Sequence, residues 1–126
     1  MAAQSGSLVY LSGHISKQDG TVPTGKLGAS LVAEAGSAGA RAVAIDLLAT
    51  LHAHTGDLNR VTRIVKLASM VNSTPDFTEQ HLVTNGASDL LREVFGESGR
   101  HARSAFGVAQ LPLGACVEIE LVAQVT

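Results

Sequence analysis

The residues best suited to chemistry lie close together near the end of the chain. Arg103 stands among small residues in the run 101–108, and Glu118 and Glu120 follow in the run 117–125. A guanidinium group binds a carboxylate through two parallel, charge-assisted hydrogen bonds, which a lysine cannot reproduce. A carboxylate beside it could orient a water molecule or move a proton. The spacing therefore suggests a cationic pocket for a small anion, with small residues at its floor.

The same residues also have ordinary interpretations. Arg103 could be a surface or interface arginine paired with Glu118 or Glu120, and spacing alone favours that pairing because functional motifs are rare. The two glutamates could equally form a solvated acidic edge, since exposed carboxylates are common. On spacing alone, these ordinary interpretations are favoured over a cationic pocket.

Other chemical signatures in the sequence are weak. The five histidines show no paired ligand spacing, so we expect no metal site. Cys116 is the single cysteine, which excludes an internal disulfide and favours a buried structural thiol over a nucleophile. The glycines around Gly36 and Gly39 lack the residues that complete a phosphate-binding loop.

Composition and charge narrow the class of protein. The chain has 126 residues, of which 45% are hydrophobic, and this predicts one globular domain over residues 1–126. A net charge of −2 with three Phe, one Tyr and no Trp is poorly suited to binding nucleic acid. No apolar run approaches the roughly 20 residues of a membrane span, and residues 1–6 lack a signal-peptide pattern. We therefore expect a soluble, cytoplasmic protein.

Alternating or dense apolar residues predict four strands. The segment 60–71 would suit either a helix or a strand, and its β-branched residues favour a strand buried on both faces. The other three segments are bounded by turn residues or alternate at period two. The predicted strands are 8–15, 60–71, 101–108 and 117–125.

Helical spacing of apolar residues predicts a first helix over 40–55. Gly56 ends it, because glycine accepts the left-handed conformation at low steric cost. The helix is not expected to extend back towards Leu31, because Gly36 and Gly39 weaken it there.

A second helix is predicted to begin at Thr74 and to run to Phe95. Thr74 would cap it and Pro75 would take its first position, and Gly96 would end it. Gly86 marks a weak point within a single helix.

The predicted elements follow one another in the order strand, helix, strand, helix, strand, strand. Two helices can cover only one face of such a sheet, yet both faces of the last strand carry apolar residues. Self-association is the simplest way to cover the second face.

In the order of its motifs the chain resembles the RidA family of reactive-intermediate deaminases, also called the YjgF or endoribonuclease L-PSP-like family. A branch with a Gly-Arg-His-Ala-Arg-Ser run looks closest, here residues 99–104. The matching residues are Leu11-Ser12-Gly13, Gly56-Asp57-Leu58, Val71-Asn72, Asp76-Phe77, Gly86-Ala87-Ser88-Asp89-Leu90-Leu91, Phe95-Gly96, Ala102-Arg103-Ser104, Leu111-Pro112 and Glu118-Ile119-Glu120.

The resemblance implies a fold, an assembly and an activity. The fold is a chorismate-mutase-like two-layer α+β fold, assembled as a homotrimer whose sheets face inward and whose three sites lie at subunit interfaces. The activity is hydrolysis of 2-imino acids to 2-keto acids and ammonia, without a cofactor.

The resemblance also assigns roles to individual residues. Arg103 would bind the substrate carboxylate, and Glu118 would hold the hydrolytic water. Ser12 and Gly13 would line the pocket with their backbone, and Asn85 would be a pocket residue on the second helix.

Two departures from the family pattern leave other functions open. The family's N-terminal segment with a pocket tyrosine has no counterpart before Leu8, and Ala105 stands where many members have cysteine. A trimeric carboxylate-binding protein without turnover is therefore an alternative, and a ribonuclease is a weaker one.

Overall fold

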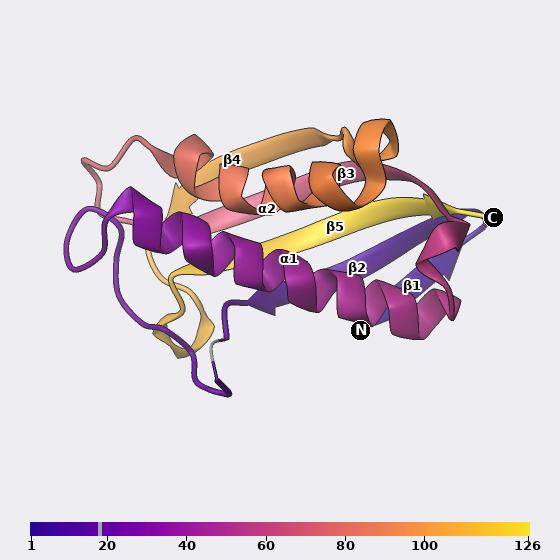
Figure 1. The fold of residues 1–126 in the computed structure, drawn as a ribbon. Helices are drawn as coiled ribbons and strands as arrows, with labels where there is room; N and C mark the ends of the chain where they lie inside the picture. The colour runs from indigo at the N-terminus through magenta and orange to yellow at the C-terminus, as the bar shows by residue number, and fades with distance from the viewer. Residues whose placement is uncertain (18) are drawn as a thin grey trace.

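The computed structural model describes residues 1–17 and 19–126. Among these residues, five strands form one mixed sheet in the order β1-β2-β5-β3-β4, and two helices lie along one of its faces (Figure 1). Neighbouring strands are antiparallel except β3 and β4, which α2 joins by a parallel crossover. The elements are β1 (Ala2–Ser5), β2 (Leu8–Ile15), α1 (Ala33–Thr55), β3 (Val61–Asn72), α2 (Gln80–Phe95), β4 (Ala102–Val108) and β5 (Val117–Val125).

The four predicted strands are confirmed as β2, β3, β4 and β5. The segment 60–71 could also have been a helix, and it is a strand because it pairs on both sides, with β4 and with β5. Strand β1 was not predicted. Its four residues carry little β-propensity and are a strand because they pair with β2 across a turn at Gly6, which has a φ of 60°.

Helix α1 begins earlier than the apolar spacing predicts. It starts at Ala33 and includes Gly36 and Gly39. A Cβ on Gly36 would lie 2.9 Å from methyl carbons of Leu27 and of Val83, so the absence of a side chain lets α1 approach its neighbours closely. This packing outweighs the roughly 1 kcal/mol that a glycine costs inside a helix.

Helix α2 begins later than predicted, and the expected start at Thr74 is wrong. The Thr74 carbonyl accepts the backbone N–H of Phe77 at 3.1 Å, and the Thr74 N–H donates to the Leu27 carbonyl at 3.0 Å. Pro75 thus occupies a turn, a position that also suits its fixed φ. The helix starts at Gln80 instead.

The predicted weak point at Gly86 lies inside a continuous helix. A Cβ on Gly86 would lie 2.0 Å from the backbone oxygen of Ser37 in α1. Gly86 is therefore where the two helices make close backbone contact, which no larger residue would permit.

The two faces of the sheet differ in character. Val117, Ile119 and Leu121 of β5 are buried beneath the helices, and the residues between them point to the other face. That other face, which we call the uncovered face, also carries Tyr10 and Phe106, each 47% exposed. Apolar residues on both faces were predicted, and a partner for the uncovered face stays a prediction. No helix in the described part of the chain is long and apolar enough to cross a bilayer.

Candidate functional site

Arg103 extends from β4 towards helix α2 and is half-buried. Its Nη1 donates a hydrogen bond to Ser88 Oγ at 3.1 Å, and its Nη2 donates to the His81 carbonyl at 3.2 Å. Both acceptors are neutral, and no carboxylate pairs with Arg103 among the described residues. The alternative that Arg103 pairs with a glutamate of β5 is therefore wrong within one chain.

A second layer of contacts supports the arginine. Ser88 Oγ lies 2.9 Å from His101 Nε2, and His101 Nδ1 lies 2.7 Å from the Gly99 carbonyl oxygen. Burial lowers the pKa of His101, and the charge of Arg103 lowers it further, while the Gly99 carbonyl acts in the opposite direction. Sequence reasoning missed Ser88 and His101 as site residues, because the hydrogen bond between them joins positions 13 residues apart.

Asn85 lies on the same flank of α2 as both Arg103 contacts. It follows His81 by four residues and precedes Ser88 by three, and residues at these spacings neighbour one another on a helix. Its half-buried side chain makes no hydrogen bond within the described residues. The helix therefore places Asn85 on the side of α2 that Arg103 contacts, and its role in a pocket stays a prediction.

Glu118 lies on the uncovered face, over the bulge of β2. The register between β2 and β5 shifts between Leu11 and His14, which places Ser12 and Gly13 at an irregular point. A Cβ on Gly13 would lie 2.4 Å from Glu118 Oε2, so the carboxylate occupies the space that a side chain would fill. The structure thus brings Gly13 and Glu118 together, with Ser12 next in the chain.

Arg103 and Glu118 point to opposite faces of the sheet. Leu67 of β3 pairs with both Arg103 and Leu121, and all three lie on the helix-covered face. Met70 pairs with Glu118, which lies on the uncovered face. One chain therefore cannot direct both side chains at the same small molecule.

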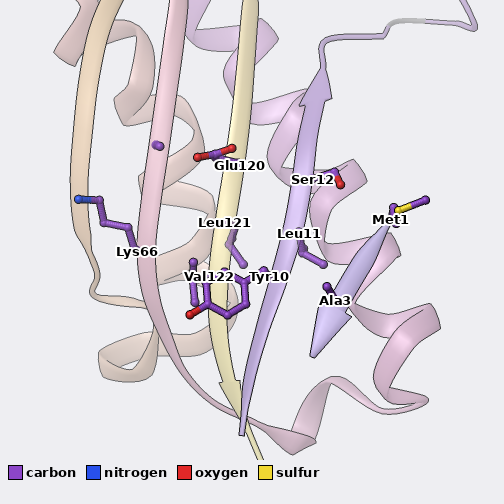
Figure 2. Close-up of a pocket in the computed structure, with 10 residues that line it drawn as sticks. Met1, Ala3, Tyr10, Leu11, Ser12, Lys66, Glu120, Leu121 and Val122 are labelled. Carbon is purple, nitrogen blue, oxygen red and sulfur yellow. The ribbon is translucent and has the colours of Figure 1, made fainter. Parts of the chain in front are cut away.

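A hollow of about 240 Å³ lies on the uncovered face (Figure 2). Glu120 lies near the middle of this face and extends towards β3, and the Tyr10 ring lies beside Val122. Lys66 lines the same hollow and makes no ion pair within the described residues. Both charged groups are thus free to contact a molecule that covers this face.

A second hollow, of about 600 Å³, lies beside the start of α2, where Gly107 and Gln80 line it. Lys26 at its wall donates to Asn72 Oδ1 at 2.6 Å and to the Ala109 carbonyl. These bonds tie the loop before α1 to the ends of β3 and β4. Arg103 lines neither hollow.

The single cysteine lies in the core. Cys116 is 2% exposed, and burial raises the pKa of its thiol, so the expectation of a buried structural cysteine is confirmed. Within residues 1–17 and 19–126, no three His, Cys, Asp or Glu side chains gather as metal ligands would.

Comparison with known proteins agrees with this fold. The family described as "YjgF/chorismate mutase-like, putative endoribonuclease" matches residues 2–125. Protein TCP17 of Trypanosoma cruzi is 55% identical over 118 residues, which are 92% of this chain and 74% of that protein.

Two crystal structures are similar along nearly the whole chain. The protein Atu1372 of Agrobacterium tumefaciens, whose function is described as unknown, is 41% identical with a TM-score of 0.96, over 99% of this chain and 80% of that one. A "putative endoribonuclease" of Shewanella oneidensis is 31% identical with a TM-score of 0.95, over 98% of this chain and 83% of that one.

Proposed function

Because the chain belongs to the YjgF/RidA family, we propose that it hydrolyses reactive 2-imino acids to 2-keto acids and ammonia. In this reaction water adds to the C=N carbon, the C–N bond breaks, and the nitrogen leaves as ammonia. The observation that carries the proposal is the uncompensated charge of Arg103, which is held only by neutral acceptors.

Arg103 is suited to anchor the substrate carboxylate. A guanidinium has five N–H donors, and two of them bond to Ser88 and His81, which leaves three for a ligand. A carboxylate bound there would be fixed by charge-assisted hydrogen bonds. The imine carbon next to it would then be held in one position for attack.

Glu118 is suited to orient the attacking water. Its carboxylate lies over Gly13, where no side chain shields it. A carboxylate in that place can accept a proton from water as the oxygen attacks the imine carbon. We propose no cofactor, because a protonated C=N carbon is already electrophilic.

The proposal requires two copies of the chain at each site, since Arg103 and Glu118 point to opposite faces of one sheet. We propose a homotrimer in which β4 and α2 of one subunit meet the uncovered face of the next. Closed rotational assembly would form three equivalent sites. The apolar residues exposed on the uncovered face support this arrangement.

The activity is tested by ammonia and keto-acid release from freshly generated 2-iminopropanoate and 2-iminobutanoate. Arg103→Ala should lower kcat/KM by about 100-fold, because it removes charged hydrogen bonds to the substrate. Arg100→Ala is the matched control, since Arg100 is an exposed arginine that pairs with Glu97 on the surface. Equal values of kcat/KM for the wild type and Arg103→Ala would contradict the proposal.

The shared site is tested by mixing two inactive variants. Arg103→Ala and Glu118→Gln are unfolded together at equal concentrations and refolded. Random trimers would carry both native groups at about one quarter of the sites, so about a quarter of wild-type activity should return. No recovery would mean that both groups act from the same subunit.

A second candidate is a carboxylate-binding protein without turnover. The separation of Arg103 from Glu118 favours it, because Arg103 can bind a carboxylate without Glu118. Calorimetry with 2-oxobutanoate would show binding that Arg103→Ala abolishes, with no ammonia released from the imines.

Ribonuclease activity, which the name of the Shewanella relative suggests, has the least support. A net charge of −2 opposes binding to an RNA backbone. Cleavage of RNA by the purified wild type but not by Glu118→Gln would establish it.

A further inference from the structure

In the hydrogen bonds that lead from Gly99 to Arg103, chemistry fixes which group donates and which accepts. The Gly99 carbonyl can only accept, so His101 Nδ1 carries a hydrogen and donates it across 2.7 Å. In the neutral imidazole, Nε2 is then an acceptor, and the Ser88 hydroxyl donates to it across 2.9 Å. The lone pairs of Ser88 Oγ are left facing Arg103 Nη1 at 3.1 Å.

We infer that Ser88 and His101 are positioning residues that hold the Arg103 guanidinium in the orientation that receives the substrate carboxylate. This inference rests on the proposed function of Arg103. His101 fixes the Ser88 hydroxyl as a donor, and Ser88 can then only accept from the arginine. Without His101, the hydroxyl would rotate and compete with the guanidinium for acceptors.

The end of this chain of bonds is rigidly held. A Cβ on Gly99 would lie 2.2 Å from the carbonyl oxygen of Leu91, so Gly99 packs directly against the backbone of α2. Ser88 is on the same helix, and His101 immediately precedes β4. These hydrogen bonds therefore connect α2 to the strand that carries Arg103, and they fix the strand and the helix relative to each other.

The neutral state of His101 fits this role. Burial and the charge of Arg103 both lower its pKa, so the accepting form of Nε2 persists at neutral pH. A protonated ring would turn Nε2 into a donor and place a second positive charge beside the guanidinium.

Three variants separate positioning from simple packing. Ser88→Ala removes the acceptor of Arg103 and should raise KM for the imine, or Kd for 2-oxobutanoate, by about tenfold with a smaller change in kcat. His101→Gln places an amide oxygen near the former Nε2 and should preserve affinity. His101→Asn reaches only as far as Nδ1 and should weaken binding as Ser88→Ala does. Equal affinities for the Gln and Asn variants would overturn the inference.

A measurement without ligand tests the same inference independently of activity. In NMR spectra of the wild type, His101 should be the Nδ1–H tautomer, and the Nε relaxation of Arg103 should show an ordered side chain. Ser88→Ala and His101→Asn should make Arg103 mobile, and His101→Gln should not. An equally ordered Arg103 in Ser88→Ala, or a proton on His101 Nε2 at neutral pH, would refute the positioning role.

The outcomes also separate this inference from the proposed function. If the NMR spectra show the expected tautomer and the expected order of Arg103, but the wild type neither hydrolyses imines nor binds keto acids, the proposed function fails and the positioning role stands.

Discussion

Arg103 is held by a hydroxyl and a carbonyl, and this choice of partners leaves its charge available. A carboxylate at 3 Å would compete with any anionic ligand, whereas neutral acceptors fix the side chain without cancelling its charge. Burial and, to a smaller extent, the positive charge of Arg103 lower the pKa of His101, because a buried imidazolium beside a guanidinium is unfavourable.

The lowered pKa of His101 predicts a pH dependence of stability. The unfolded histidine takes up a proton near its ordinary pKa of about 6.5, whereas the folded one does so only at lower pH. The contribution of His101 to the free energy of unfolding is therefore fully present above about pH 6.5, and it is lost as the pH falls towards the pKa of the folded state. Urea unfolding of the wild type and His101→Gln at about pH 8 and about pH 5 should show a larger loss in the wild type. Equal losses would contradict the prediction.

The contact between α1 and α2 sets where the site lies, because α2 carries Ser88, Asn85 and His81. The helices approach most closely where Gly86 meets the backbone of Ser37. A larger residue there would push α2 away from α1 and, with it, the acceptors of Arg103.

Gly86→Ala should therefore destabilise the fold, although alanine favours a helix by about 1 kcal/mol over glycine. The new Cβ would lie 2.0 Å from the Ser37 oxygen, and backbone cannot move aside cheaply. We expect a loss of about 1–3 kcal/mol in the free energy of unfolding, measured by urea denaturation. Gly39→Ala is the matched control, with a smaller loss, because its nearest contacts are side-chain atoms at 3.3 Å. If Gly86→Ala were more stable than the wild type, the two helices could move apart at little cost and the prediction would be wrong.

The whole molecule is covered on one face and open on the other. Five strands in the described residues bear two helices on a single side, and the uncovered face carries exposed aromatic side chains and unpaired charges (Figures 1 and 2). The homotrimer proposed above would cover this face.

Phe106→Lys should prevent the proposed homotrimer from forming and leave the subunit folded. Phe106 is 47% exposed in the single chain, so the substitution costs little there, but a lysine buried between copies is unfavourable. Ile45→Lys on α1 is the control, because Ile45 is also exposed, at 53%, and α1 takes no part in the proposed interface. Sedimentation velocity should give one subunit of 12.9 kDa for Phe106→Lys and three for the control. A trimer of Phe106→Lys would exclude this face as the interface.

Local patterns in the sequence were enough to predict four strands, one helix end at Gly56 and another at Gly96. These features depend on residues near one another in the chain, because the spacing of apolar residues indicates the type of element and a glycine indicates where a helix ends. The motif order also predicted the family, now shown by the match over residues 2–125.

Contacts between distant residues were decided by the tertiary structure alone. The starts of α1 and α2 depend on packing around Leu27, and β1 depends on its pairing with β2. Likewise, spacing placed Arg103 and Glu118 15 residues apart without showing that the strand register turns them to opposite faces. The sequence by itself determined which groups could bind a carboxylate and water, whereas the sheet decided that one chain cannot bring those groups together.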